Sequence, residues 1–339
     1  MGKIPQKIAK GLPYYLTPDT LSNKAIKMLI FLLKLVESIK FSVSGFSSGG
    51  FMSMQMHIAH SSLIQGVGII AGGPYHCMQT YSQKTCTKFP NKIEISRLVK
   101  YAKEEELKGN IDSLTNLNST EVWLFGGTKD KMVLQGIVGK VSEFYEYFQA
   151  NVEFVQNIES QHMFVTDSFG SLCGVYEWPY IANCQFDSAG RILSKIYGEL
   201  LMKKPYSQRR LHKFDQRVYE SDQVGMADFG YIYVPESCWI ETCRVHMVLH
   251  GCGMNTDYIG SFLIKFAGYN EWAEANSLII IYPQAARHHK LNYGACWDAS
   301  GSWDPNYSTK KGKHLSILFN ISQNVPRILE SLLLIGFDN

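Results

Sequence analysis

The chain has 339 residues, of which 45% are hydrophobic and 19% are charged, a composition typical of a globular protein with a substantial core. The formal net charge of +3 is small and dispersed, so it does not indicate a nucleic-acid partner. No stretch reaches the roughly 18 consecutive apolar residues of a transmembrane helix, and we therefore expect no stable membrane insertion.

The first forty residues are expected to form an N-terminal extension, and residues 41–339 one α/β catalytic domain. Within the extension, residues 24–36 combine lysines with a short apolar run. This pattern fits a displaced signal peptide that starts at Met28, and it fits an amphipathic helix packed on the domain equally well.

Strand and helix patterns alternate along the rest of the chain. Short buried strands are expected at residues 40–44, 67–71, 122–125, 152–155, 245–249 and 278–282. Helical spacing is expected at residues 51–59, 97–108, 141–150, 272–276 and 314–334, the last interrupted by Pro326. The segment 173–237 has weaker periodicity and is expected to mix helix with loops. The alternation predicts a mainly parallel central sheet flanked by helices.

Eight cysteines fall as four pairs of sequence neighbours, none with the C-x-x-C spacing of a zinc or redox site. We interpret them as disulfides of a protein from an oxidising compartment, although eight buried free thiols would be the alternative. The pairs are Cys77 and Cys86, Cys173 and Cys184, Cys238 and Cys243, and Cys252 and Cys296.

A G-x-S-x-G motif at residues 45–49 places Ser47 between a predicted strand and a predicted apolar helix. This is the context of a nucleophile elbow, in which a tight turn raises the serine oxygen into the active site and leaves no room for Cβ atoms at the two glycines. A turn or N-cap serine would be the structural alternative. The flanking elements favour the nucleophile.

An acid and a histidine follow in the order that this fold requires. Asp130 and His162 come just after the predicted strands 122–125 and 152–155, where catalytic loops leave a parallel sheet. His162 would take the proton of Ser47, and Asp130 would fix its tautomer. Asp167 and Asp112 compete as the acid. His246 lies within a strand and is interpreted as a core residue, while three further histidines lie too close to Ser47 in sequence: His57, His60 and His76.

Ser47 comes too early for an ordinary α/β-hydrolase, because several strands normally precede the nucleophile. The missing parts appear late in the chain, where the strand at 245–249 runs into His250-Gly251-Cys252. A plain turn is the alternative for this loop, but its position suits an oxyanion loop. The fold is therefore expected to be circularly permuted, with the helix at 314–334 in the place that normally precedes the nucleophile strand. The backbone N–H groups of Ser48 and Cys252 would form the oxyanion hole, and a Cys252–Cys296 bridge would hold it.

Taken together, these residues resemble the extracellular polyhydroxybutyrate depolymerases of the circularly permuted α/β-hydrolase type. The matching stretches cover roughly residues 41–320 and are 43–52, 126–130, 162–170, Cys184, 233–243, 249–252, 269–273, 282–284 and 296–298. The resemblance implies a serine hydrolase of short-chain 3-hydroxyalkanoate polyesters, with Ser47, Asp130 and His162 as the triad.

The resemblance further implies an enzyme without cofactor or metal. Trp297 and Trp303 would be natural contacts for an apolar polyester or small ester substrate. We expect a monomer that is extracellular or periplasmic. Two alternatives stay open: a feruloyl-, acetyl-carbohydrate or lipolytic esterase with the same machinery, and a catalytically silent, disulfide-stapled binding protein.

Overall fold

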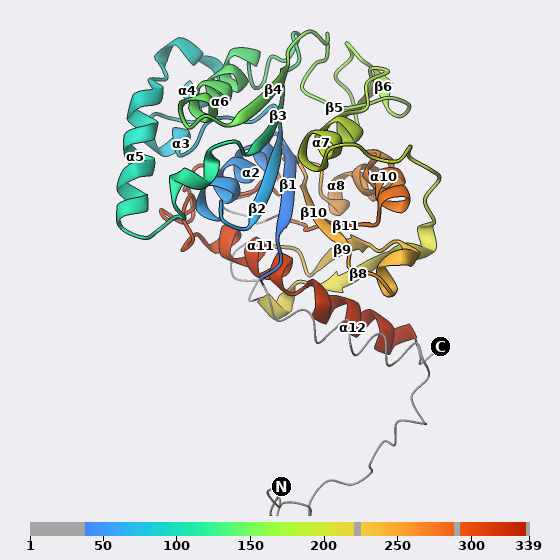
Figure 1. Cartoon of the computed structure of the whole chain (residues 1–339). Helices are drawn as coiled ribbons and strands as arrows, with labels where there is room; N and C mark the ends of the chain where they lie inside the picture. Colours follow the sequence, from blue (N-terminus) through green and yellow to red (C-terminus); the bar gives the residue numbers. More distant parts are fainter. Residues whose placement is uncertain (1–37, 220–224, 288–291, 337–339) are drawn as a thin grey trace, which may run out of the picture.

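The computed structural model describes residues 38–219, 225–287 and 292–336 (Figure 1). The predicted signal or helical segment at 24–36 lies outside these residues. The division into an extension, residues 1–40, and a domain, residues 41–339, therefore stays a prediction.

An eight-stranded sheet with the order β4-β3-β2-β1-β10-β11-β9-β8 forms the centre of the molecule. The nucleophile strand β1 lies in its middle, between β2 and β10, and is buried along its whole length. The strands are β1 (Phe41–Phe46), β2 (Ile64–Ile70), β3 (Glu121–Phe125), β4 (Asn151–Val155), β8 (Leu211–Asp215), β9 (Phe229–Tyr233), β10 (Arg244–Leu249) and β11 (Leu278–Tyr282).

The six predicted strands are the six parallel ones, and the prediction of a mainly parallel sheet is confirmed. The antiparallel strands β9 and β8 extend the sheet at the β11 edge. They fall in the segment expected to mix helix with loops, so that expectation was wrong for residues 211–215 and 229–233. The edge strand β8 has partly exposed, charged residues and lacks the continuous apolar run of a buried strand, and β9 begins with an exposed phenylalanine followed by a glycine.

Two groups of helices cover the sheet, and Figure 1 shows them on opposite sides of it. In one group α2 contacts β1, β2 and α11, while α5 contacts α6; in the other, α7 and α10 contact each other. The helices are α2 (Ser48–Ala59), α3 (Cys77–Thr80), α4 (Thr85–Lys88), α5 (Ile95–Leu107), α6 (Gln135–Tyr147), α7 (Ser188–Tyr197), α8 (Thr256–Ile259), α9 (Phe262–Phe266), α10 (Tyr269–Asn276), α11 (Lys313–Gln323) and α12 (Val325–Gly336).

Helix α2 lies in the interior, and all of its twelve residues are buried. Its apolar side chains pack against the strands that precede and follow it. Two of its polar side chains bond within the helix: Ser53 Oγ donates to Gly49 O at 2.8 Å, and Gln55 Nε2 donates to Phe51 O at 3.0 Å. A helix buried on every side gives the nucleophile at its N-terminus a rigid support.

The predicted C-terminal helix is two helices, because α11 ends at Gln323 and Pro326 occupies the second position of α12. Proline has no N–H and is tolerated only in a first turn. Gln323 bridges to the entrance of β1: its Oε1 accepts from Ile39 N and its Nε2 donates to Ile39 O, both at 2.9 Å. The late helix α11 thus lies beside the start of the nucleophile strand, as the permuted order predicts.

A separate three-stranded sheet, β5-β7-β6, follows β4 in the chain. Its strands are β5 (Phe164–Thr166), β6 (Ser171–Leu172) and β7 (Ile181–Asn183), which all run parallel.

The cysteines pair as sequence neighbours, which confirms the predicted disulfides: Cys77–Cys86, Cys173–Cys184, Cys238–Cys243 and Cys252–Cys296. Among the described residues, none of the helices is both long and apolar enough to span a bilayer.

Candidate active site

Ser47 stands at the junction of β1 and α2 with φ 56° and ψ −120°, a backbone conformation that L residues rarely adopt. The turn needs both motif glycines. A Cβ at Gly45 would lie 2.2 Å from Gly49 O, and one at Gly49 would lie 2.2 Å from Leu249 O. The sequence therefore folds into a strained elbow in which only the serine side chain leaves the packed backbone.

A continuous chain of hydrogen bonds joins Ser47 to His162 and Asp130. His162 Nε2 lies 2.9 Å from Ser47 Oγ, and His162 Nδ1 lies 2.7 Å from Asp130 Oδ2. The carboxylate fixes the tautomer with the proton on Nδ1, so that Nε2 accepts from the serine hydroxyl. Histidine and aspartate are only 6% and 4% exposed.

Backbone groups hold the aspartate in place. Its second oxygen, Oδ1, accepts from Met132 N at 2.8 Å and from Val133 N at 2.9 Å. Both carboxylate oxygens of Asp130 are therefore satisfied, one by the loop that carries it and one by His162. Such an orienting group keeps the imidazole aligned while its charge changes.

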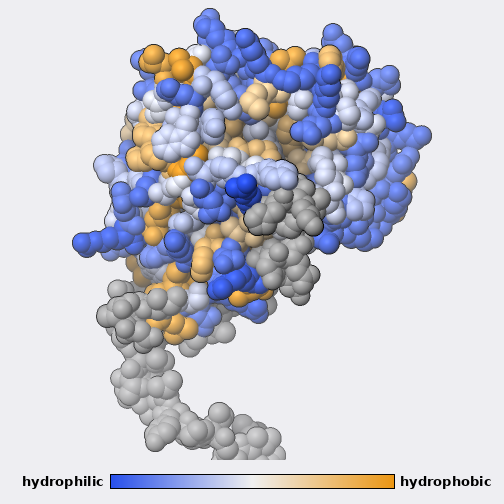
Figure 2. Space-filling view, turned by 180° about the vertical axis from the view of Figure 1, so that it is seen from behind, coloured by the Kyte–Doolittle hydropathy of each residue, from blue (hydrophilic) through white to orange (hydrophobic). Residues whose placement is uncertain are grey.

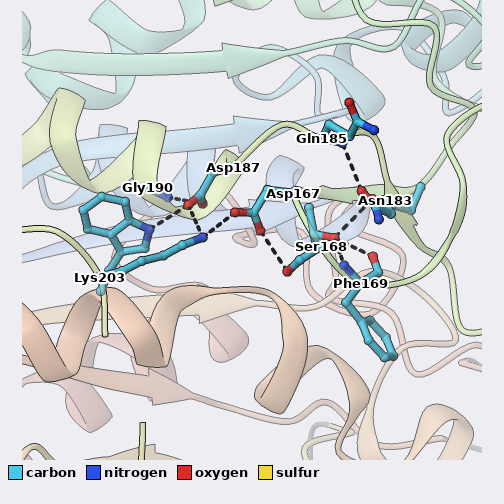
Figure 3. Close-up of polar contacts among 11 residues, drawn as sticks. Asp167, Ser168, Phe169, Asn183, Gln185, Asp187, Gly190 and Lys203 are labelled. Atoms are coloured by element: carbon cyan, nitrogen blue, oxygen red, sulfur yellow. Dashed lines mark hydrogen bonds and ion pairs between the residues drawn. The ribbon is translucent and has the colours of Figure 1, made fainter. Parts of the chain in front are cut away.

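The competing acids are engaged elsewhere. Asp167 and Asp187 share the ammonium of Lys203, as Figure 3 shows, at 2.5 Å and 2.7 Å. Burial opposes ionisation of Asp167, but the bonds to Lys203 outweigh it and hold the pKa of this carboxyl below its usual value. Asp112 pairs with Lys310 at 2.5 Å.

His246 is a core residue, as the sequence predicts. Its ring nitrogens lie 2.6 Å from Ser42 Oγ and 2.8 Å from Ser44 Oγ, both on β1. Burial lowers the pKa of His246 to about 3, so the ring stays neutral and serves as a polar link between β1 and β10.

The predicted oxyanion loop begins at the end of β10 and is held by three different interactions. His250 Nε2 accepts from Ala285 N at 3.0 Å, Trp297 Nε1 donates to His250 O at 2.9 Å, and the Cys252–Cys296 disulfide ties the loop to the segment before Trp297. Burial lowers the pKa of His250 to about 4. The loop is thus fixed from both ends.

A cavity of about 500 Å³ opens over Ser47. Ser48, Cys252 and His162 line it, so the two predicted oxyanion donors face the same space as the serine. The side-chain oxygen of Ser48 is buried, and no described residue is its hydrogen-bond partner. The roles of these residues as oxyanion donors remain predictions.

The two predicted aromatic contacts, Trp297 and Trp303, both line the cavity but differ in environment. Trp297 is only 2% exposed and supports His250 behind the loop. Trp303 lies edge-on to His314, with ring centroids 5.1 Å apart. Its loop is shaped by the Asp298 carboxylate, which accepts from Asp304 N at 3.0 Å.

Sequence reasoning missed three further aromatic side chains at the rim of the cavity. Tyr176, Tyr180 and Tyr293 line the cavity, and Tyr176 and Tyr293 are 47% and 65% exposed. They belong to irregular segments without periodicity, so no pattern places them near Ser47. The disulfide Cys173–Cys184, which encloses both Tyr176 and Tyr180, was the one available signal that this loop is held to the fold.

An aromatic face continues from this rim across the surface near the small sheet. Tyr258 OH donates to Tyr293 O, Trp178 Nε1 donates to Tyr258 O at 3.4 Å, and Trp178 packs on Phe262 with centroids 5.0 Å apart. Phe262 and Phe266 both stack on Phe169. Figure 2 shows pale and orange residues gathered at its upper left, the side that carries the small sheet. We call the half-buried Phe262 and the exposed members together the aromatic face: Tyr176, Trp178, Tyr258, Phe262, Phe266 and Tyr293.

No group of three or more His, Cys, Asp or Glu side chains suited to a metal ion occurs within the described residues. The hydrogen bonds of the site are those of the triad side chains and of the Met132 and Val133 N–H groups that hold Asp130.

Comparison with known proteins finds relatives that are polyhydroxybutyrate depolymerases. The chain is 34% identical over 294 residues to a poly(3-hydroxybutyrate) depolymerase of Delftia acidovorans, covering 84% of this chain and 59% of that one. It is 34% identical over 280 residues to a polyhydroxybutyrate depolymerase of Talaromyces funiculosus, covering 78% and 80%. No protein-family model matches the chain.

Two solved structures share the fold. A PHB depolymerase variant complexed with an R3HB trimer superposes with a TM-score of 0.80 at 30% identity, over 85% of this chain and 96% of that one. The crystal structure of PHB depolymerase from Penicillium funiculosum superposes with a TM-score of 0.79 over the same shares.

The fold is that of the α/β-hydrolase class, and β10, the strand that precedes the predicted oxyanion loop, comes after the Ser47 strand β1 in the chain. The relatives found by sequence and by structure identify the family within this class. The chain belongs to the polyhydroxybutyrate depolymerase family.

Proposed function

We propose that the protein is a secreted serine esterase that hydrolyses poly(3-hydroxybutyrate)-like polyesters and short hydroxyacyl oligomers through an acyl-enzyme on Ser47. One observation carries the proposal: Ser47, His162 and Asp130 form a continuous hydrogen-bonded chain, and Ser47 and His162 line a cavity together with aromatic, apolar and polar side chains. The solved relative that is complexed with an R3HB trimer supports the substrate class.

The geometry suits acyl transfer. Ser47 Oγ attacks the ester carbonyl while His162 Nε2 takes its proton, and the protonated ring then gives that proton to the leaving alcohol. Asp130 stabilises the imidazolium. Water repeats the sequence on the acyl-enzyme and releases a carboxylic acid. The N–H groups of Ser48 and Cys252 would stabilise the oxyanion, and one such donor contributes about 2.7–4 kcal/mol to the transition state.

The aromatic face supports a polymeric substrate over a small one. Trp178 is 55% exposed and Phe266 38%, and both belong to one cluster of ring contacts. Hydrogen bonds from Trp178 to Tyr258 and from Tyr258 to Tyr293 link this cluster to the cavity. Contiguous exposed apolar surface marks an interaction site in soluble proteins, and a flat polyester surface would cover these rings.

Four disulfides fit an oxidising environment, and we propose an extracellular protein.

We also propose that it acts as a monomer, because the triad, the oxyanion loop and the cavity are all formed by one chain. The chain spans 59% of the length of the Delftia relative. We therefore propose only ester hydrolysis for this chain and no further activity of that longer protein.

A substrate panel tests the proposal. Purified protein should clear a suspension of poly(3-hydroxybutyrate) and hydrolyse p-nitrophenyl butyrate, and both activities should disappear in Ser47→Ala. Feruloyl and acetyl-xylan esters should be poor substrates. Preferred turnover of a feruloyl or acetyl-xylan ester would reassign the substrate class, and unchanged turnover in Ser47→Ala would reject the serine mechanism.

A further inference from the structure

The cavity over Ser47 contains one lysine whose charge the triad does not use. Apart from tyrosines, the described lining residues with ionisable side chains are Lys88, His162 and Asp298. His162 belongs to the triad. The Asp298 carboxylate is occupied by backbone N–H groups of its own loop, among them Ser302 at 3.1 Å and Asp304 at 3.0 Å.

Lys88 has no carboxylate partner among the described residues. Its Nζ donates to the carbonyl oxygen of Lys131, a neutral acceptor next to Asp130 in sequence. An ammonium carries three N–H donors, so a neutral acceptor leaves two donors and the whole positive charge uncompensated. The neighbouring lining side chains on the same segment, Gln83 and Thr87, are polar. This end of the cavity is therefore cationic and hydrogen-bonding, in contrast to the aromatic rim.

The position of Lys88 is fixed by the fold. It ends helix α4, which the Cys77–Cys86 disulfide ties to α3. Leu134 N donates to Thr87 O at 2.9 Å, which joins α4 to the end of the loop that carries Asp130. A cation held this way is presented to a ligand with little loss of side-chain freedom.

The sheet order places this cation on the leaving-group side. The oxyanion loop follows β10, on one side of β1, whereas α4 follows β2 and packs against α6 on the other side, with the Asp130 and His162 loops (Figure 1). The carbonyl oxygen of a bound ester points to the oxyanion loop, and the alcohol leaves toward His162. In a chain of 3-hydroxyacyl units, the alcohol part of any cleaved ester carries the carboxyl end of the chain.

We infer that Lys88 is a specificity-determining residue that binds the free carboxylate end of hydroxyacyl oligomers, so that the enzyme cuts a set number of units from that end. The inference rests on the proposed function and adds to it a preference between ends of the same substrate. Lys88 contributes a charge-assisted hydrogen bond to a carboxylate, in addition to the ester contacts that every substrate makes.

A pair of matched substrates tests the inference. The trimer of (R)-3-hydroxybutyrate is offered as the free acid and as its methyl ester, and kcat/KM is measured for both. The wild-type protein should prefer the acid by about tenfold, the ratio expected for one hydrogen bond to a charged group. Lys88→Met should bring the ratio close to one by raising KM for the acid alone, and Lys88→Arg should retain most of the preference.

Lys84→Met is the matched control, because Lys84 lies at the start of the same short helix, carries the same charge and does not line the cavity. Its ratio should equal that of the wild type. A tetramer labelled at its hydroxyl end should give a labelled fragment of one length with the wild type, and labelled fragments of several lengths with Lys88→Met.

The outcomes separate the two proposals. Hydrolysis of acid and methyl ester at equal rates by the wild type, or an unchanged ratio in Lys88→Met, overturns the role of Lys88 and leaves the esterase intact. An equal loss for both substrates in Lys88→Met assigns the lysine a structural role and also overturns it. Hydrolysis of neither trimer, nor of p-nitrophenyl butyrate, overturns the esterase and this inference together.

Discussion

The two walls of the cavity are built in different ways. The acid–base wall consists of residues 126–134 and 156–163, the loops after β3 and β4, and backbone hydrogen bonds join them: Thr128 N to Ile158 O at 2.9 Å and Lys129 N to Ser160 O at 3.1 Å. The oxyanion wall consists of residues 250–254 and 292–298, which are linked by a disulfide and a buried tryptophan.

This difference follows from where the segments come from. Neighbouring parallel strands bring the two loops of the acid–base wall together automatically, so ordinary backbone pairing completes it. The two segments of the oxyanion wall are far apart in sequence and irregular, and they share one short backbone bond, from Gly253 N to Gly294 O at 2.6 Å. A covalent link compensates for the missing regular structure. We therefore expect that the contribution of the acid–base wall to activity depends mainly on its side chains. The contribution of the oxyanion wall should depend mainly on the disulfide that holds it.

Asp130→Asn should have the largest effect, and it addresses the acid–base wall. The amide cannot stabilise the imidazolium and favours the wrong tautomer of His162, so kcat for p-nitrophenyl butyrate should fall by about 10³–10⁴-fold. The free energy of unfolding should change far less. Asp167→Asn is the control, since Asp167 pairs with Lys203 instead. A larger loss in the control would transfer the acid role to Asp167.

Removal of the Cys252–Cys296 bridge addresses the oxyanion wall. The double variant Cys252→Ala, Cys296→Ala should lose about 10²-fold in kcat, because a misplaced oxyanion donor weakens transition-state binding. The bridge closes a loop with a sequence separation of 44, so unfolding free energy should fall by about 4 kcal/mol.

The matched control removes Cys238 and Cys243, whose separation is 5 and which do not line the cavity. This pair should cost about 2 kcal/mol of stability and leave kcat unchanged. Equal kcat in both double variants would show that the disulfide does not position the oxyanion wall.

Trp178→Ala addresses the surface outside both walls. The loss of a 55% exposed ring that packs on Phe262 should reduce binding to polyester particles and clearing by about tenfold, a typical effect of removing one interface aromatic. Turnover of soluble p-nitrophenyl butyrate should stay the same. Leu107→Ala, an 87% exposed residue on α5, is the control. If both variants clear particles like the wild type, the aromatic face is not the adsorption surface.

The last prediction concerns the pH dependence of stability rather than activity. Burial lowers the pKa of His250 on the oxyanion wall from 6.5 to about 4, so between these values only the unfolded chain binds the proton. Stability is therefore fully present above pH 6.5 and is lost as the pH falls toward 4, by about 1.4 kcal/mol per pH unit for each such histidine. The others with a pKa lowered to about 3 or 4 are His57, His60, His76 and His246.

Denaturant unfolding at a series of pH values checks this slope. His60→Phe keeps a ring against Phe319, on which His60 stacks, and should reduce the slope by one proton. A stability profile that is flat between pH 6.5 and 4 would mean that the histidines are not buried in the neutral form.

The sequence predicts the acid–base wall well because regular structure carries its residues. Ser47 and Asp130 each follow a buried strand whose apolar run is visible, and His162 follows the half-buried strand β4. The order of the parallel strands brings the three residues together. The early position of Ser47 also indicated that the oxyanion loop comes from β10. Helix ends were less predictable: α6 begins at Gln135, six residues before the predicted start.

The rim of the cavity could not be predicted in the same way. Tyr176 and Tyr293 lie in irregular segments, and Lys88 ends a four-residue helix that is tied by the Cys77–Cys86 disulfide. Such positions depend on long-range contacts and have no periodic signal. Strand β8 was missed because the sheet edge leaves it partly exposed, and β9 because its five residues include a glycine and begin exposed.

The central claim is that the elbow presents Ser47, and no other serine, to the substrate between the two walls. The most direct measurement is peptide mass spectrometry after reaction with diisopropyl fluorophosphate. We predict a single adduct on Ser47, absent from Ser47→Ala and strongly slowed in His162→Ala. An adduct on Ser48 or another serine, or full esterase activity in protein that carries no adduct, would contradict the account.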